Sequence, residues 1–146
     1  MKKLQLLLIA AGVVVIAVLF CGNRAAKYTL HMAKENDDVI DVHGKITNMY
    51  KLEEFYDDVN SGHAGSIRIT RYNTEGEAII YDIDYNGEII NCSVDRRRDS
   101  TAKDKNRKVS VYKYKKLYIR RDENVTEYFL TGSDSEDLSI LVTGNN

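Results

Sequence analysis

The sequence predicts an α+β domain, an antiparallel sheet with one packed helix, preceded by an N-terminal membrane segment. Residues 78–95, AIIYDIDYNGEIINCSVD, place Asn86-Gly87 between two alternating apolar runs, which is the strongest short-range signal of a hairpin. The 146 residues include ten tyrosines, a residue type that favours strands. One convincing helical pattern of apolar side chains lies at residues 49–59.

The N-terminus carries the membrane signal. Two lysines precede Leu4–Phe20, seventeen residues with one polar interruption, Gln5. This length lies between signal-peptide cores of about 7–15 residues and transmembrane helices of about 17–25. We expect residues 1–21 to be an uncleaved signal-anchor that holds the domain outside the cytoplasm at the cell membrane. The alternatives are a lipid anchor on Cys21, as in a lipoprotein, and a cleaved, secreted form. Both are disfavoured because the small residues that these processing sites need are missing.

A tether is predicted between the membrane segment and the domain. Residues 22–37 lack a clear period, so we expect them to be a tether and place the domain at residues 38–143. Near its start, Val39, Ile40 and Val42 make a short apolar stretch before His43-Gly44.

The predicted helix, residues 49–59, presents one apolar stripe to the core. Asn48 is the expected N-cap, and Gly62 is the expected stop. The stripe consists of Leu52, Phe55, Tyr56 and Val59, and acidic residues cover the outer face at Glu53, Glu54, Asp57 and Asp58.

The hairpin follows a predicted strand at residues 66–72. A two-residue turn at Asn86-Gly87 fixes its register, because side chains alternate between the two faces of a strand. Cys92 is then buried, whereas Asp82 and Asp84 lie on the solvated face. The predicted pairs are Ile83 with Ile90, Tyr81 with Cys92 and Ile79 with Val94.

The C-terminal third is predicted to be mostly strands. Residues 95–107 are polar and without a period, so they are expected to form a long exposed loop. The apolar set shifts within residues 109–120, which indicates a bulge or two strands. Closing strands are predicted at residues 125–131 and 138–142.

The net charge of −1 hides segregated blocks. Residues 34–95 carry five basic and fourteen acidic side chains, residues 96–121 carry twelve basic and two acidic ones, and residues 122–146 carry six acidic ones. We favour mutual compensation, in which the basic segment lies between acidic neighbours in the fold. The alternative is a basic patch for an anionic partner.

The basic segment also holds the best candidate for a binding surface. Anionic lipid or an anionic wall polymer is the expected partner, whereas an exported domain seldom meets nucleic acid. The candidate binding residues are Arg96, Arg97, Arg98, Lys103, Lys105, Arg107 and Lys108, together with the turn residue His43.

Catalytic chemistry has little support in the sequence. The three histidines lack metal-ligand spacing, and motifs for a serine nucleophile or a phosphate loop are missing, so we expect no metal and no cofactor. A buried Cys92 would be inert. Asp82 and Asp84 share a face as an acid/base pair would, but on an exposed strand such a pair more often serves solubility.

We therefore expect a non-enzymatic binding or scaffolding module of the cell envelope. The alternatives are a small hydrolase that uses His43 or the Asp82/Asp84 pair, and an electrostatic binder that acts through residues 96–121. Convergence of His43, Arg98 and Asp99 around one cleft would favour the hydrolase.

The chain resembles a family of exported proteins of low-GC Gram-positive bacteria that is known only as a domain of unknown function. The resemblance covers most of residues 38–133 and implies a lipoprotein-type anchor, with no assigned activity. Family members often have a cysteine pair near the positions of Tyr114 and Ser133, and its loss here implies a domain held by packing. The matching runs are DVIDVHGKITN (38–48), IRITRYNTEGEAIIYDIDYNGEII (67–90) and Arg98-Asp99.

Overall fold

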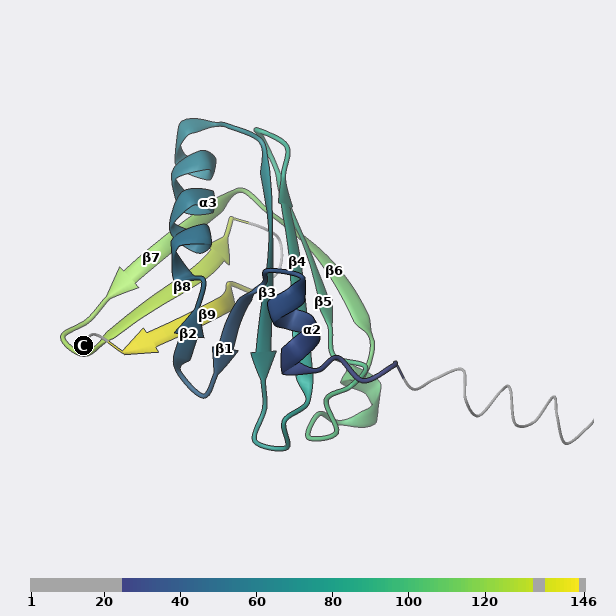
Figure 1. Cartoon of the computed structure of the whole chain (residues 1–146). Helices are drawn as coiled ribbons and strands as arrows, with labels where there is room; N and C mark the ends of the chain where they lie inside the picture. Colours follow the sequence, from purple (N-terminus) through teal and green to yellow (C-terminus); the bar gives the residue numbers. More distant parts are fainter. Residues whose placement is uncertain (1–24, 133–135, 145–146) are drawn as a thin grey trace, which may run out of the picture.

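A computed structural model describes residues 25–132 and 136–144, which form a mostly sheet α+β fold with one main helix (Figure 1). The predicted class, the main helix and the antiparallel sheet are confirmed. The predicted membrane segment, Cys21 and Ser133 lie outside the described residues. In chain order the elements are α2 (Leu30–Glu35), β1 (Val39–Val42), β2 (Lys45–Thr47), α3 (Met49–Ser61), β3 (Gly65–Tyr72), β4 (Ala78–Tyr85), β5 (Ile90–Asp95), the 3₁₀ turn η1 (Asp104–Asn106), β6 (Val109–Tyr114), β7 (Lys116–Arg121), β8 (Val125–Thr131) and β9 (Leu138–Gly144).

The strands form two sheets rather than the single sheet that was expected. The large sheet has the order β2-β1-β3-β4-β5-β6, and the small sheet has the order β7-β8-β9. Neighbouring strands are antiparallel except β1 and β3, which run parallel. The main core cluster joins α3 and the small sheet to one face of the large sheet, while α2 packs on the other face (Figure 1).

The strand signal in residues 109–120 is resolved as two strands. β6 ends the large sheet and β7 starts the small one, and Lys115 lies between them. The Lys115 N–H donates to the carbonyl of Thr131 at 3.0 Å, which fixes the change of sheet. The small sheet also contains a bulge, so that the consecutive residues Ile140 and Leu141 are both buried.

The register of the central hairpin differs from the predicted one by two residues. Ile83 faces Cys92, and Tyr85 and Ile90 form the last pair, so the loop has four residues instead of two. The side-chain oxygen of Asn86 accepts hydrogen bonds from the backbone of Glu88 and Ile89 at 3.0 and 2.8 Å, which makes a wider Asx turn. Since a shift of two keeps every side chain on its face, the predicted inward and outward faces are confirmed.

A two-residue hairpin turn occurs instead at His43-Gly44. Val42 pairs with Lys45, and the φ angles of His43 and Gly44 are 54° and 87°. Positive φ at both central residues is typical of a type I′ turn, the tight turn that suits the twist of paired strands. His43 is therefore a turn residue.

Helix α3 ends as predicted but begins differently. Gly62 has a φ of 74°, and its N–H and that of His63 bond back to the last turn of the helix, as in a Schellman motif. Asn48 occupies the N-cap position, but its side chain does not cap α3. It donates instead to the carbonyl of Asp38 at 2.9 Å and to Asp37 at 3.0 Å, so it holds the start of β1.

The tether prediction is wrong for the described part of residues 22–37. Helix α2 buries Ala33 completely against Ile40 and Ile80, and Tyr28 is also buried in this second cluster. A helix of six residues has fewer than two turns, so its apolar residues show no repeating pattern in the sequence. This explains why the helix was not predicted.

A buried carboxylate fastens this segment to the sheet. Asp38 is almost fully buried, and its Oδ2 accepts hydrogen bonds from the Tyr28 hydroxyl at 2.9 Å and from the Thr70 hydroxyl at 2.7 Å. Asn36 donates to the same Tyr28 oxygen at 2.7 Å. These bonds join the segment before α2, the start of β1 and strand β3.

Among the described residues, no helix is both long enough and apolar enough to cross a membrane.

Tyr28→Phe should destabilise the domain because it removes one of two donors from a buried carboxylate. The expected loss is about 1–3 kcal/mol in the free energy of unfolding, measured by urea denaturation. Tyr50→Phe is the matched control, because Tyr50 is 53% exposed. Equal stability of the two variants would mean that residues before Asp38 do not belong to the folded domain.

Candidate functional site

One face of the large sheet is only half covered. The even-numbered residues of β4 point away from the main core, and α2 covers Ala78 and Ile80 but not Asp82 and Asp84. Beyond α2 the face carries only short or charged side chains on its three central strands. Register pairs Asp82 with Arg68 and Ser93, and Asp84 with Ser66 and Asn91.

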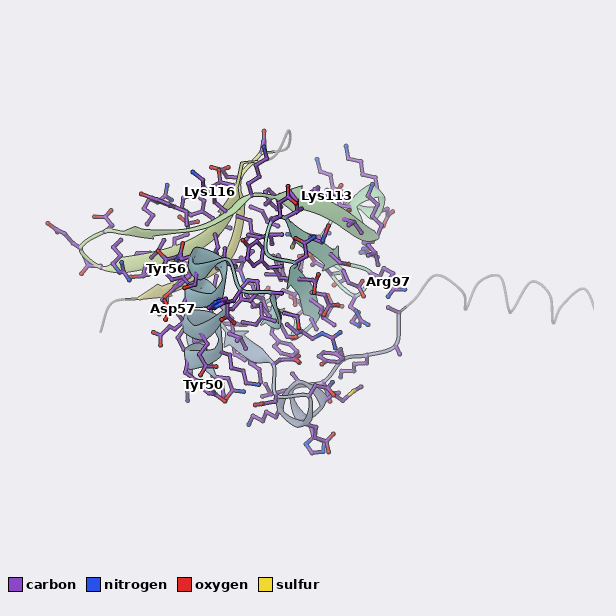
Figure 2. All side chains as sticks on the ribbon, turned by 90° about the horizontal axis from the view of Figure 1, so that it is seen from above. Tyr50, Tyr56, Asp57, Arg97, Lys113 and Lys116 are labelled. Carbon is purple, nitrogen blue, oxygen red and sulfur yellow. The ribbon has the colours of Figure 1, made fainter. Side chains whose placement is uncertain are left out.

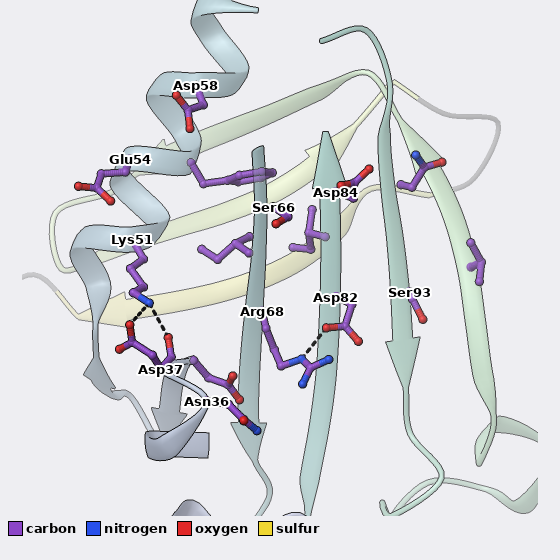
Figure 3. A pocket seen from close by; sticks show the side chains of 16 residues that line it. Asn36, Asp37, Lys51, Glu54, Asp58, Ser66, Arg68, Asp82, Asp84 and Ser93 are labelled. Carbon is purple, nitrogen blue, oxygen red and sulfur yellow. Dashed lines mark hydrogen bonds and ion pairs between the residues drawn. The ribbon is translucent and has the colours of Figure 1, made fainter. Parts of the chain in front are cut away.

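The same region of β3 also has an unpaired edge. β1 pairs only with Ile69–Tyr72, so residues 65–68 of β3 pair with β4 alone. Helix α3 runs beside this free edge, and Lys51, Glu54 and Asp58 line the space with the sheet residues (Figure 3). The result is a cleft of about 810 Å³, defined by the uncovered sheet face, the free edge of β3 and α3.

A glycine allows α3 to lie close to β3 at this edge. A Cβ atom on Gly65 would lie 3.2 Å from Oδ2 of Asp58 and 3.6 Å from the ring of Phe55. The contact with Asp58 would be tighter than ordinary van der Waals packing, whereas the contact with Phe55 would be an ordinary one. Gly65 therefore lets the Asp58 carboxylate lie directly over the strand.

The charges of the cleft are partly paired. Arg68 Nε donates to Asp82 at 2.5 Å, and this hydrogen bond raises the pKa of the guanidinium. Lys51 forms an ion pair with Asp37 (Figure 3). Three other acidic side chains line the cleft in addition to the buried Asp38. They make no ion pair with any described residue, and they are Glu54, Asp58 and Asp84.

The predicted site residue His43 lies at the opposite end of β3 from the cleft. Its Nε2 lies 3.1 Å from the carbonyl oxygen of Asn73, whose amide donates to Asp99 at 3.0 Å. Asp99 is buried and also accepts from the Thr101 hydroxyl at 2.6 Å. Burial opposes ionisation of Asp99, but the hydrogen bonds from Thr101 and Asn73 outweigh it and lower its pKa.

Arg98 is turned away from that network. Its Nη1 donates to Asp95 at 2.8 Å, its Nε donates to the carbonyl of Ala26 at 2.7 Å, and its guanidinium lies 5.9 Å from the centre of the Tyr28 ring. Asp99 and Arg98 line two different hollows. The His43, Arg98 and Asp99 side chains therefore share one end of the domain without converging on one cleft.

The three consecutive arginines find partners within their own loop. Arg97 and Arg98 both bind Asp95, and Arg96 lies 3.4 Å from Asp99. Burial opposes ionisation of Asp95, but hydrogen bonds from the side chain and backbone of Arg97 and from Arg98 hold its pKa well below the usual range. The loop at residues 95–107 is thus less exposed than expected. Part of its positive charge is compensated by acidic residues of the same loop.

The other basic candidates remain at the surface. Arg107 donates to the carbonyl of Ser100 at 2.7 Å and lies 3.7 Å from Asp104. Lys103, Lys105 and Lys108 are exposed and form no ion pair with the described residues.

Cys92 lies in the main core as a fully buried free thiol. Burial raises its pKa to about 12, so the thiolate needed for nucleophilic attack is scarce at neutral pH. In the described residues, His, Cys, Asp and Glu side chains form no group of three that could hold a metal ion.

Residues 36–129 match the family described as "Domain of unknown function (DUF4362)". The chain belongs to this family. No curated protein and no solved structure shows a detectable similarity to the chain. The matched span begins with Asn36 and Asp37, so it includes the residues that connect α2 to β1.

Asp95→Asn should lower stability at neutral pH by about 1–3 kcal/mol, because two arginines lose a charged acceptor. Since folding lowers the pKa of Asp95 from 3.8, its contribution is fully present above about pH 4 and is lost as the pH falls through the lower folded value. The difference between wild type and variant in urea denaturation should therefore shrink below pH 4.

Asp104→Asn is the control for this pH series, since the Asp104 side chain is 99% exposed. It should track wild type at every pH. A difference between wild type and Asp95→Asn that stays constant from pH 7 to pH 3 would contradict the assigned ion pairs.

Proposed function

We propose that this protein is a non-enzymatic binding module held outside the cytoplasm by its N-terminal segment, and that the cleft beside α3 takes its ligand. The observation that carries the proposal is the cleft itself, an uncovered polar sheet face next to a free strand edge. Its volume of about 810 Å³ falls in the range of ligand sites, about 300–1,000 Å³.

The shape of the cleft favours an extended peptide. Residues 65–68 of β3 offer a strand edge next to the N-terminal end of β1, and a peptide that lies along this edge could add main-chain hydrogen bonds there. Side chains of such a strand point alternately toward the two faces of the sheet, so every second one would reach the uncovered face.

The charge of the cleft favours ammonium groups on that peptide. Asp58 and Asp84 flank the free edge from the helix and from β4, and Glu54 lies one turn before Asp58 on α3 (Figure 3). The two cations of the cleft are already bound to Asp37 and Asp82. An excess of unpaired carboxylates attracts a cationic ligand and repels an anionic one.

The geometry gives less support to a hydrolase. His43 follows Val42, which pairs with Tyr72, whereas Asp82 pairs with Arg68, four residues earlier on β3. At about 3.3 Å per residue this separation is about 13 Å along the strand, too far for a shared proton transfer. Asp82 is in addition occupied by Arg68.

The full chain in a neutral detergent should bind trilysine but not triglutamate. In NMR titrations, trilysine should shift the backbone amide signals of Ser66, Arg68 and Asp84, because these residues border the free edge. Asp58→Asn combined with Asp84→Asn should weaken trilysine binding about fivefold, as expected for two solvent-accessible charge contacts.

The control for this titration is Asp57→Asn, a charge change on the exposed side of α3 that does not line the cleft. It should leave the affinity unchanged. Equal shifts with both peptides, or shifts confined to other surfaces, would contradict the proposed site.

Expressed in bacteria, the full chain should sediment with membranes, and protease added to intact protoplasts should digest residues 38–143. Both outcomes follow from an apolar segment that leaves the domain outside. Incorporation of labelled lipid precursor, tested with Cys21→Ser as control, separates a lipid anchor from a signal-anchor. Recovery in the cytosolic fraction would contradict the proposed location.

A further inference from the structure

The basic loop lies beside the point where the described chain begins. Ala25 and Lys27 line one hollow together with Arg97, Arg98 and Arg107. The hydrogen bond from Arg98 to the carbonyl of Ala26 holds these two parts together. Figure 2 places Arg97 on the side of the domain from which the described chain starts.

The sequence limits how far this part of the domain can move from the apolar segment. Only six peptide steps separate Phe20, the last apolar residue of that segment, from Ala26. A fully extended chain covers about 3.3–3.6 Å per residue, so six steps span at most about 22 Å. Any anchor that uses the apolar segment or Cys21 therefore keeps the loop near the membrane surface.

Most of the cations that face outward at this position form no ion pair with a described residue. Arg96, Arg97 and Arg98 are engaged with Asp95 and Asp99. The remaining cations make up a surface that we call the basic end, and it consists of Lys27, Lys103, Lys105, Arg107 and Lys108. Of its members, only Arg107 has an acidic neighbour within 4 Å among the described residues, the fully exposed Asp104.

We propose that the basic end rests on anionic lipid headgroups and so fixes the orientation of the domain on its membrane. The inference depends on the anchoring proposed above. Exposed lysines near an anionic surface each gain about fivefold in association, and the attraction fades over about 8 Å at physiological salt. Because the short link from Phe20 keeps the basic end near the surface, its contact with the headgroups is an intramolecular step that a high effective concentration favours.

The test uses the full chain reconstituted into vesicles of phosphatidylcholine, alone or mixed with phosphatidylglycerol. Brief acylation with an amine-reactive reagent, read by mass spectrometry, reports the exposure of each lysine. Lys103, Lys105 and Lys108 should be protected at least about threefold in the anionic vesicles, and high salt should remove this protection. The internal reference is the distal group Lys113, Lys115 and Lys116, which lies at the other end of β6.

Two triple variants supply the matched control, with Lys27 as reporter. Lys103→Glu, Lys105→Glu and Lys108→Glu together should abolish the protection of Lys27 in anionic vesicles. The same change at the three distal lysines should leave it intact.

Each outcome decides the proposal. Protection that is equal in neutral and anionic vesicles, on a chain that floats with the vesicles, overturns the lipid contact but not the anchoring. Equal protection by soluble polyphosphate in neutral vesicles overturns it as well, because the surface would then recognise a free polyanion. A chain that fails to float overturns the anchoring and the lipid contact together.

Discussion

Incomplete coverage of the large sheet is the constraint on which the rest of the structure depends. A sheet with two apolar faces must bury both, and here α3 and the small sheet cover one face while a six-residue helix covers only half of the other. Within the single strand β4, the outward residues are apolar where α2 covers the sheet and acidic where the sheet is uncovered. In β4, Ala78 and Ile80 lie beneath α2, and the next outward residues are Asp82 and Asp84. The buried Asp38 fixes where the coverage stops, because its hydrogen bonds to Tyr28 and Thr70 hold α2 in place.

Local pattern predicted the faces of the strands better than their partners. The alternation in β4 and β5 correctly places Cys92 inside and Asp82 outside, because the side-chain period of a strand is independent of its neighbour. The predicted register was wrong because Asn-Gly is the strongest signal of a two-residue turn and was interpreted as one. In the structure the Asn86 side chain accepts hydrogen bonds from two backbone N–H groups, which favours a wider loop. The tight turn occurs at His43-Gly44, where His43 adopts a positive φ, a conformation that is uncommon for residues other than glycine.

The candidate cleft could be predicted only in part for a similar reason. Asp82 and Asp84 were correctly assigned to the outer face, and the helical period places Glu54 and Asp58 on one side of α3. These residues form a cleft because β1 pairs in parallel only with residues 69–72 of β3, which leaves residues 65–68 without a partner strand on that side. Parallel pairing joins segments that are distant in sequence, so no local pattern specifies it.

The fold places the basic and acidic side chains at different parts of the domain. The arginines nearest to Asp95 and Asp99 are neutralised within their loop, so the positive charge at this end of the domain comes from the residues of the basic end. The unpaired carboxylates of the cleft lie further along the sheet, on α3 and at the end of β4 that is remote from the loops at Asn73 and Asp99. An anionic surface attracts the first group and repels the second. On the anionic membrane proposed above, both forces would favour the same orientation, with the basic end toward the membrane and the cleft away from it. A ligand could then reach the free edge of β3 without crossing the headgroup layer, so the two proposed surfaces do not compete for the same space.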